Sequence, residues 1–440
     1  MANRVLRRGP LRPGDGERLT LDPQLVEATA KLCVRARAAA ATLAPADTAT
    51  KNAFLGRVEQ LLVERADAIA EMNRGDVARA HERGRTPAFI DRLSIDADGV
   101  RRLAGAVAEI RLLPDPVGRT TYGARRPNGL HVSRVTIPLG VIAMVYESRP
   151  NVTIDAGCLC IKAANAAILR GGSDARDSNA ALLQLMRDAL ADVGLPIDAA
   201  SAPASPGHDG IRALVSQVGG IDLVIPRGGT RLIDEVNKWA RVPVIQHYEG
   251  VCHVFVHQSA DLDEATNIVV NAKAQRPGTC NAMEAVLVDR AIAGSAVPQI
   301  VAALEAANVQ IRACPTTREL RPDLPAADSD DLGREYLDYI ALVRVVDGLD
   351  GAIDHIQRYG SGHTEAICTA DVRAAQRFVD VVQASCVLVN ASTRFNDGGC
   401  LGLGAEIGIS TSKLHAYGPM GLDSLTTQKY VVMGDGHVRT

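Results

Sequence analysis

Hydrophobic residues recur with helical spacing through the first quarter of the chain. Residues 25–43, 51–73 and 98–113 place apolar side chains three and four positions apart, with arginine and glutamate on the opposite side. The pattern changes in 131–137 and 141–146, where β-branched residues dominate on both sides of Gly140. The sequence therefore predicts helices first and extended strands after them.

Beyond residue 141, short apolar runs alternate with amphipathic segments. The alternation predicts strands at 141–146, 166–170, 221–225, 242–247, 254–256, 285–288, 309–312, 339–346, 364–369, 386–389 and 430–433, and helices at 152–163, 178–193, 231–240, 261–274, 291–307, 350–357 and 371–382. The segments 200–210 and 315–331 are predicted to be loops. Because a strand–helix–strand repeat builds a parallel sheet with helices on both faces, we expect a doubly wound α/β fold, an arrangement that often binds nucleotides.

Length and composition support this interpretation. At 440 residues the chain exceeds what one hydrophobic core usually supports, so two or more domains are expected, the second beginning near Cys280. Only 3% of the residues are aromatic although 47% are hydrophobic, a balance typical of helices packed on parallel sheets. A net charge of −3 predicts no nucleic-acid partner, and no apolar run is long enough to predict a membrane span.

The nine cysteines are scattered through apolar surroundings. An odd number of dispersed cysteines is unlike a secreted disulfide framework and favours a reducing cytoplasm. No Cys-x-x-Cys pair is present, so we expect no metal site. Residues 1–18, with several arginines, prolines and glycines, are expected to form a disordered tail.

Cys280 is the cysteine with the most suggestive surroundings. Pro277 and Gly278 predict a tight turn that delivers Cys280 to the start of the apolar run 285–288. Thr279 could cap a helix, which would place Cys280 in a first turn, where backbone N–H groups favour the thiolate. Taken alone, the local sequence favours the alternative, an inert, half-buried cysteine beside a turn.

Several longer motifs occur in one order along the chain. They are GVIAMVYESRPN at 140–151, IPRGGT at 225–230, QRPGTCN at 275–281, SGHTE at 361–365, VNASTRFNDGGCLGL at 389–403 and KLHAYGPMGL at 413–422. In these motifs the chain resembles the gamma-glutamyl phosphate reductases, also called glutamate-5-semialdehyde dehydrogenases, a branch of the aldehyde dehydrogenase superfamily. The resemblance covers nearly everything after the tail, and it favours the reactive interpretation of Cys280.

The resemblance implies a step of L-proline biosynthesis. L-Glutamyl 5-phosphate and NADPH would give L-glutamate 5-semialdehyde, phosphate and NADP, through a thioester on Cys280. Oxyanion donors would be the backbone amides of Cys280 and Asn281, with Asn151 in the place of a superfamily asparagine. The alternative is that Arg149, Pro150 and Asn151 form an ordinary turn that caps the helix at 152–163.

One departure from the superfamily concerns the base that activates water. Hydrolytic aldehyde dehydrogenases carry a glutamate in a Glu-Leu-Gly-Gly motif, and the matching stretch here begins at His247. Loss of that base would favour exchange with phosphate over hydrolysis. Glu249 lies two positions away, and a gap in the alignment that brings it into register would restore the base. A hydrolytic NAD-linked enzyme and a non-catalytic scaffold homologue remain the alternatives.

The cofactor is expected to be NADP. Arg170 and Ser173 stand where the superfamily usually has a lysine and often a glutamate on the adenine ribose, and they should admit a 2′-phosphate. Gly228 and Gly229 would let the backbone approach the pyrophosphate, and Glu335 matches a glutamate that holds the nicotinamide ribose.

Arginines are the candidates for the anionic groups of the substrate. Arg149, Arg276 and Arg394 could each bind the phosphate or the carboxylate, and Ser392 lies in a loop that could complete the pocket, together with Asn390 and Thr393. A structural ion pair is an equal alternative for any one arginine. His363 and His415 are more simply explained as structural hydrogen-bonders.

The resemblance also implies an aldehyde dehydrogenase-like organisation. We expect a Rossmann-type NADP-binding domain at 19–121 and 138–274, a catalytic α/β domain at 275–387, and a small β oligomerisation element with the C-terminal segment at 122–137 and 388–440. A homodimer or tetramer is expected, and the glutamate kinase that makes the substrate is a further candidate partner.

Overall fold

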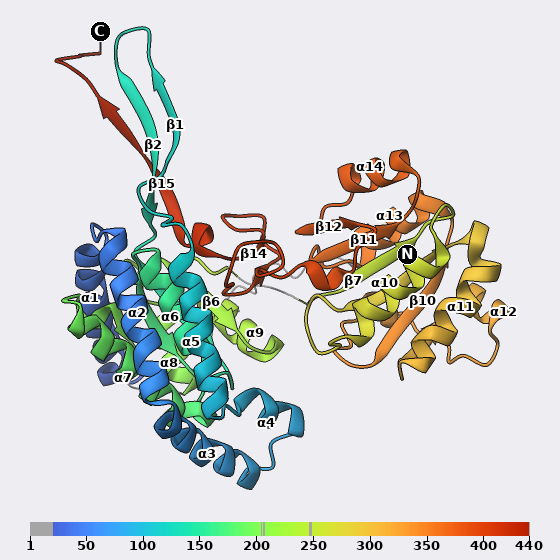
Figure 1. Cartoon of the computed structure of the whole chain (residues 1–440), viewed down its shortest axis with the longest axis horizontal. Helices are drawn as coiled ribbons and strands as arrows, with labels where there is room; N and C mark the ends of the chain where they lie inside the picture. Colours follow the sequence, from blue (N-terminus) through green and yellow to red (C-terminus); the bar gives the residue numbers. More distant parts are fainter. Residues whose placement is uncertain (1–20, 204, 206, 246–248, 440) are drawn as a thin grey trace. The chain divides into compact units, whose positions relative to one another are not determined.

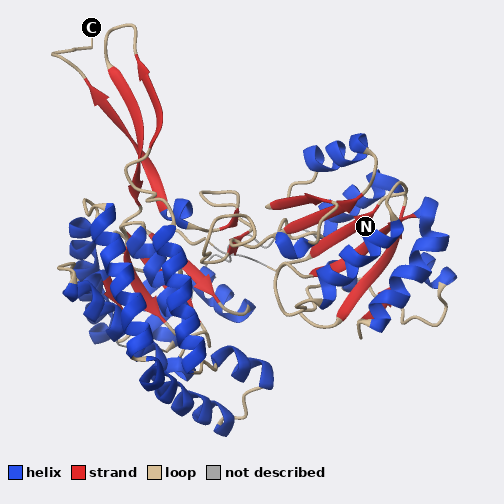
Figure 2. Cartoon of the chain, viewed as in Figure 1, coloured by secondary structure: helices blue, strands red, loops and turns tan. Residues whose placement is uncertain are grey.

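The structure of the protein is a computed structural model that describes residues 21–203, 205, 207–245 and 249–439. These residues form two compact units, each with a parallel sheet between helices (Figures 1 and 2). The first unit contains 21–245, 403–408 and 420–439, and the second contains 249–402 and 409–419. The predicted tail at 1–18 lies outside the described residues.

The first unit is built on a four-stranded parallel sheet. Its strands are β3 (Val141–Tyr146), β4 (Ala166–Arg170), β5 (Ala200–Ser201) and β6 (Leu223–Arg227), in the order β5-β4-β3-β6. Val224 makes a further parallel bridge to Val244. This is the strand order of half a Rossmann fold, as the alternation of apolar runs predicts.

Helices surround this sheet. They are α1 (Pro23–Leu43), α2 (Thr48–Glu64), α3 (Ala66–Glu82), α4 (Pro87–Leu93), α5 (Ala97–Leu112), α6 (Asn151–Lys162), α7 (Arg176–Asp192), α8 (His208–Val215) and α9 (Thr230–Trp239). The side chains of Asp22, Asp47 and Asp96 cap α1, α2 and α5 by accepting backbone N–H bonds. The single helix predicted at 51–73 is wrong, because the chain breaks at Arg65 into α2 and α3, and Arg65 pairs with Asp188 of α7 at 2.6 Å.

A three-stranded antiparallel sheet extends away from the helices of the first unit (Figure 1). It contains β1 (Thr120–Arg125), β2 (His131–Pro138) and β15 (Thr426–Met433), with β2 in the centre. The predicted extended segments 131–137 and 430–433 are thus confirmed, and they pair with each other along the full length of β15.

The second unit contains a six-stranded, fully parallel sheet. Its strands are β7 (Cys252–Val256), β8 (Met283–Asp289), β9 (Gln310–Ala313), β10 (Ile340–Val346), β11 (Thr364–Cys368) and β12 (Cys386–Val389), in the order β12-β11-β7-β8-β10-β9. Because β7 pairs with β8 and β11, residues 252–274 belong to this unit. The predicted boundaries, a first domain up to 274 and a second one beginning near Cys280, therefore fall too late.

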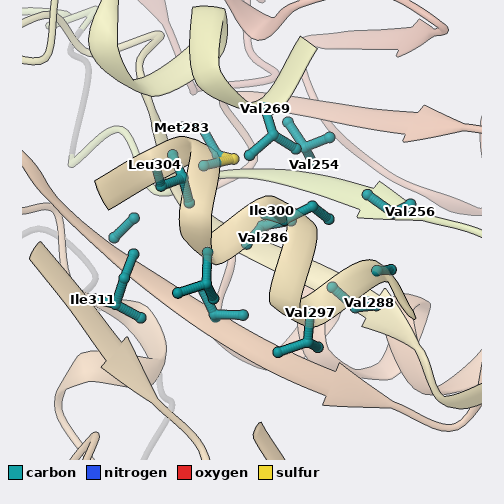
Figure 3. Packing of buried hydrophobic residues seen from close by; sticks show 14 of the residues in the cluster. Val254, Val256, Val269, Met283, Val286, Val288, Val297, Ile300, Leu304 and Ile311 are labelled. Atoms are coloured by element: carbon teal, nitrogen blue, oxygen red, sulfur yellow. The ribbon is translucent and has the colours of Figure 1, made fainter. Parts of the chain in front are cut away.

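Helices cover both faces of the second sheet. They are α10 (Leu262–Ala274), α11 (Ala293–Ala306), α12 (Pro315–Leu320), α13 (Gly348–Tyr359) and α14 (Val372–Val381). Side chains of α10 and α11 bury one face, including Val269, Val297 and Ile300 (Figure 3), and α13 and α14 bury the other with Ile353, Ile356 and Phe378. Two short strands of two residues each, β13 (Ile409–Ser410) and β14 (Gly418–Pro419), form an antiparallel pair with each other.

Three predictions about loops and strands need correction. The predicted loop 200–210 contains β5 and the start of α8, and the predicted loop 315–331 contains α12, where Thr317 is buried. The predicted strand 242–247 is reduced to the bridge at Val244, and its last two residues lie outside the described part. Within the described residues, no helix is long and apolar enough to cross a membrane.

Candidate functional site

Cys280 lies on a turn between a helix and a buried strand. The helix α10 ends at Ala274 and β8 begins at Met283, and the backbone N–H of Ala282 donates to the carbonyl of Thr279 at 3.0 Å. The expected helical first turn with Thr279 as its cap is therefore wrong, since a strand follows Cys280. The thiol is half-buried and receives no help from a helix macrodipole of its own segment.

The backbone of Cys280 is held tightly from one side. Its carbonyl oxygen accepts a hydrogen bond from the thiol of Cys252, the first residue of β7, at 3.1 Å. A Cβ atom on Gly250 would lie 2.2 Å from the same oxygen, so only glycine allows the two segments to approach this closely. The sheet thus fixes the position of the Cys280 backbone.

Arg394 holds the other side of the turn. Its Nη1 donates to Thr279 Oγ1 at 2.9 Å and its Nε donates to Gln275 Oε1 at 2.8 Å. The buried hydroxyl of Ser392 accepts the backbone N–H of Arg394 at 3.3 Å and shapes this loop. The structure therefore brings the predicted residues Arg394, Ser392 and Cys280 together.

Positive charge gathers beside Cys280. The pKa of Arg394 is lowered, first by burial and then by the like charge of Arg276, while Asp397, Cys280 and Cys400 act in the opposite direction. A guanidinium nevertheless stays protonated in proteins. Two arginines beside a half-buried thiol form a setting that suits an anion.

Asn281 has a structural side chain. It is buried, and its Nδ2 donates to the carbonyl of Asn396 at 3.0 Å, while Asn396 in turn donates to Thr364 Oγ1 at 2.8 Å. These bonds connect the Cys280 turn to the loop that contains Arg394 and to the start of β11. Any direct part of Asn281 in the chemistry would therefore have to involve its backbone amide.

Glu335 lies next to the segment that packs on Cys280. Its Oε1 accepts the backbone N–H of Gly250 at 2.9 Å, and burial raises the pKa of its carboxyl group. His247 is outside the described residues, as is Tyr248, so the stretch on which the water-activating base would fall is only partly described. Glu249, which follows it, is exposed.

Two of the remaining polar candidates in this unit, His363 and Asn390, hold the fold. His363 is buried, with Nδ1 at 2.6 Å from Thr364 Oγ1. Asn390 pairs with both backbone groups of Thr369, at 2.8 and 2.9 Å, and so closes the loop after β12. His415 is exposed and has a positive φ of 69°. Among the described residues, no group of three or more His, Cys, Asp or Glu side chains could hold a metal ion.

The first unit has its own candidate pocket at the carboxyl ends of β3, β4 and β6. A cavity of about 290 Å³ is lined by Arg170, Ser173, Arg85 and Arg231 among others. Arg170 is 6% exposed, and its Nη2 donates to the carbonyl of Gly207 at 3.3 Å. The lining also contains the carboxylates Glu147 and Asp174, so its three arginines leave an excess of one positive charge. That charge and the Ser173 hydroxyl suit a phosphorylated nucleotide at the strand ends of a Rossmann-like sheet.

The glycine turn after β6 fits the same interpretation. A Cβ atom on Gly228 would lie 2.6 Å from Glu147 Oε2, and the backbone N–H of Gly229 donates to that oxygen at 3.2 Å. Gly229 immediately precedes α9, and a Cβ atom on it would meet nothing within 4 Å among the described residues. The space beside the Gly229 Cα is thus open to a pyrophosphate, but the Glu147 carboxylate would have to leave the Gly229 N–H before that group could bind the ligand.

Glu147, Arg85 and Arg231 line this pocket but were not among the predicted site residues. Glu147 lies inside the motif GVIAMVYESRPN, so its position was available as a signal. Arg85 is distant in sequence, in the helical first quarter of the chain. It reaches the pocket because Arg85 and Arg83 both pair with Asp174 at 2.8 Å. Nothing in the local sequence of Arg85 indicates this contact.

Arg149 and Asn151 belong to the first unit. The backbone N–H of Val152 donates to the carbonyl of Arg149 at 3.1 Å, and Asn151 begins α6 with its Nδ2 donating to Asp155 Oδ2 at 2.9 Å. The capping alternative is thus correct for the backbone of this turn. The proposed role of Asn151 as an oxyanion donor stays a prediction.

Asp155 gives a testable pH dependence. Burial raises the pKa of its carboxyl from 3.8 to about 6, against the opposing effects of Asn151 and Arg227. Because the folded-state value is raised, its stabilising contribution is full below the unfolded value and is lost as the pH rises through 6. Asp155→Asn should remove this dependence and stabilise the first unit at pH 8 by about 2 kcal/mol, measured by thermal unfolding from pH 4 to 8.

The matched control for this measurement is Asp91→Asn, an exposed aspartate on α4. It should leave the slope of stability against pH unchanged. An Asp155→Asn variant with the same slope as the wild type would mean that burial does not perturb this carboxyl group.

The fold and the cysteine site define the class of the protein. The sequence profile of the aldehyde dehydrogenase family matches residues 12–318. An acetylating aldehyde dehydrogenase from Geobacillus thermoglucosidasius has the same fold, with a TM-score of 0.67 at 17% identity, covering 95% of this chain and 98% of that one. The chain belongs to the aldehyde dehydrogenase family, whose members use a nicotinamide cofactor.

Nearer relatives narrow the family to one branch. The chain is 53% identical to the gamma-glutamyl phosphate reductase of Sorangium cellulosum over 93% of this chain and 97% of that protein, and 49% identical to that of Desulfovibrio desulfuricans over 94% and 99%. The crystal structure of the gamma-glutamyl phosphate reductase from Thermotoga maritima matches with a TM-score of 0.92 at 42% identity, over 94% of this chain and 100% of that one. The predicted branch, gamma-glutamyl phosphate reductase, is confirmed.

Proposed function

We propose that this protein reduces L-glutamyl 5-phosphate to L-glutamate 5-semialdehyde with release of phosphate, in L-proline biosynthesis. The observation that carries the proposal is the similarity to gamma-glutamyl phosphate reductases over nearly the whole of both chains. The turn at Cys280, with arginines beside it, supplies the chemistry that such a reaction needs.

Cys280 is the nucleophile in this proposal. Its thiolate attacks the acyl carbon of the substrate, the bond from that carbon to the phosphate oxygen breaks, and phosphate leaves with the bonding electrons. The product is a thioester on Cys280, which accepts hydride more readily than an oxygen ester. After reduction, the thiohemiacetal expels the thiolate and releases the aldehyde.

The arginines bind the anionic groups of the substrate. Arg394 is fixed by Thr279 and Gln275, so its guanidinium is oriented before the substrate arrives. Arg276 is exposed and lies close enough to affect the pKa of Arg394, which places a second cation at the same site. Arg149 is the candidate from the first unit, and Ser392 supports the Arg394 loop.

The developing oxyanion needs N–H donors. The backbone amides of Cys280 and Asn281 are the candidates in the second unit, since the side chain of Asn281 is already bound to Asn396. Asn151 is the side-chain candidate in the first unit, and its amide would have to leave Asp155 to serve.

We assign NADP(H) as the cofactor, and the residues of the first unit fit it. Arg170, Arg85 and Ser173 would hold a 2′-phosphate, Gly228 and Gly229 would admit the pyrophosphate, and Glu335 of the second unit would hold the nicotinamide ribose. When bound, NADPH supplies the hydride for the thioester carbon. The protein residues bind and orient it.

An assay of the reverse reaction tests the proposal most directly. Glutamate 5-semialdehyde should reduce NADP in a phosphate-dependent manner, and NAD should be the poorer acceptor. Rapid oxidation of the aldehyde in phosphate-free buffer would instead support a hydrolytic NAD-linked dehydrogenase. Absence of turnover under both conditions would support the scaffold alternative.

Ser173→Glu should reverse the cofactor preference. A carboxylate beside Arg170 would repel the 2′-phosphate, so kcat/KM for NADP should fall at least about tenfold while that for NAD changes little. The matched control is Ser173→Gln, which has the same size without the charge. Equal losses with both cofactors in Ser173→Glu would contradict the assignment of this pocket.

The outer sheet of the first unit supports self-association. Its strands β1 and β15 each leave one edge without a strand partner among the described residues, and Tyr122, Tyr430, Val432 and Met433 are exposed. We therefore propose a homo-oligomer that uses this element. Association with the glutamate kinase stays a prediction, as does a cytoplasmic location.

A further inference from the structure

The second unit has a crevice at the end of its sheet that is opposite Cys280. Cys280 precedes β8 and therefore lies at the amino ends of the strands. A cavity of about 570 Å³ opens at the carboxyl ends, bordered by Arg290 after β8, Cys314 after β9, and Val346 and Asp347 at the end of β10. It continues between β10 and α13. A ligand in it would not be the substrate held at Cys280.

The topology of the sheet explains why the crevice exists. β8 and β10 are neighbours, but the chain leaves β8 for α11 on one face and leaves β10 for α13 on the other. The two connections therefore diverge at adjacent strand ends. In open α/β sheets, ligands bind in the crevice outside the carboxyl ends of strands at such a switch point.

One cation in the crevice has no opposite charge. Arg290 pairs with Asp347 at 2.5 Å and Arg358 lies 3.8 Å from Asp354. Arg344 differs: its guanidinium lies 5.9 Å from the centre of the Tyr359 ring, and no carboxylate in the described part of the chain pairs with it. Arg344 is thus the arginine of the crevice whose guanidinium is left to pair with a ligand.

A buried histidine beside this charge also lacks a partner. His355 of α13 borders the cavity and is 2% exposed, and neither of its ring nitrogens has a hydrogen-bond partner among the described residues. Burial lowers the pKa of His355 to about 2, with His253 and Arg344 acting in the same direction, so the ring is neutral at pH 7. It therefore offers one N–H donor and one acceptor nitrogen.

The ring of His355 is held in place by its neighbours. The Tyr359 ring lies 4.8 Å away, and the His253 ring lies 5.1 Å away with its Nδ1 at 2.8 Å from Glu365 Oε2. Such packing fixes the two unpartnered nitrogens before a ligand arrives. A buried polar group without a partner is rare, and a bound ligand is one of its recognised explanations.

We propose that this crevice is a second binding site for a small organic anion, whose carboxylate or phosphate group pairs with Arg344 and whose polar part hydrogen-bonds to His355. The lining carries three arginines and three aspartates, so the ligand anion is selected by the position of Arg344 and not by an excess of positive charge. Asp347 and Asp354 are beside arginines, and Asp328 accepts the backbone N–H groups of Asp330 and Asp331. The volume suits a metabolite of ordinary size.

Calorimetric titration of the full-length protein tests the site, with citrate and glycerol 3-phosphate as the carboxylate and phosphate probes. At least one probe should bind the wild type, and Arg344→Met should weaken its binding at least about tenfold, since a charge-assisted hydrogen bond is lost. His355→Phe should weaken it as well. The probe that binds identifies the anionic group.

Two further variants separate this site from the others and from misfolding. Arg394→Met changes the surroundings of Cys280 and should leave the binding unchanged, and Arg344→Lys keeps the charge and should retain part of it. Binding that persists in Arg344→Met but is lost in Arg394→Met would overturn the proposal. So would the failure of both probes to bind the wild type.

Discussion

Replacing Cys280 by serine is expected to abolish the phosphate-dependent reduction of NADP by glutamate 5-semialdehyde. Serine has the shape of cysteine, but its hydroxyl is far less acidic than a thiol and forms a poorer acyl intermediate for hydride transfer. Binding of NADPH should stay close to that of the wild type, because the residues assigned to the adenosine half of NADPH lie in the first unit, whereas Cys280 lies in the second. Steady-state kinetics and fluorescence titration with NADPH measure the two effects separately.

Cys386→Ser is the matched control for this experiment. Cys386 is half-buried like Cys280 and lies in the same unit, at the start of β12. The Cys386→Ser variant should retain activity, and this result would show that the loss of activity in Cys280→Ser is not a general effect of removing a thiol. Full activity in Cys280→Ser would exclude the thioester mechanism and require another nucleophile.

Lys273→Met is expected to destabilise the second unit by about 3–5 kcal/mol. The side chains of Lys273 and Glu284 are 0% and 1% exposed and pair at 2.7 Å. Removing the lysine leaves the Glu284 carboxyl buried without its cation; even in the pair, burial raises the pKa of this group to about 7. The free energy of unfolding, from urea denaturation followed by circular dichroism, measures the loss.

This pair also brackets the Cys280 turn, because Lys273 belongs to the last turn of α10 and Glu284 is the second residue of β8. Activity should therefore fall together with stability. The control is the double variant Lys273→Met with Glu284→Gln, which removes the unpaired acid and should recover at least half of the lost stability. If Lys273→Met unfolds at the same urea concentration as the wild type, the ion pair does not stabilise this unit.

Local sequence predicted the regular elements well where a buried apolar run is bounded on both sides by residues that end a strand. The strands β3, β4 and β12 match the predicted residues, because each is a short apolar run with breaks on both sides. The helix predicted at 51–73 was wrong because apolar spacing continues across Arg65. At the break Arg65 pairs with Asp188, and α2 and α3 both contact α7, a tertiary arrangement that the local pattern does not contain.

The surroundings of Cys280 show the same division between local and tertiary information. Thr279 is a good helix cap by its chemistry, yet the following residues form β8, which pairs with β7 and β10. Sheet pairing outweighs the local preference because β8 is buried along its whole length. The same pairing places β7 and α10 in the second unit. The alternation of strands and helices along the chain could not show to which unit they belong.

The sequence by itself determined the α/β class, the turn that presents Cys280 and the reductase branch, since apolar alternation and ordered motifs are properties of neighbouring residues. Only the tertiary structure decided which groups meet at the site. Arg394 reaches Thr279 across 115 positions, and Arg85 reaches the pocket beside Ser173 from the helical quarter. Such contacts depend on the order in which the chain connects the strands of each sheet. That order is set by the burial of both faces of the sheet, and no local stretch of sequence contains this information.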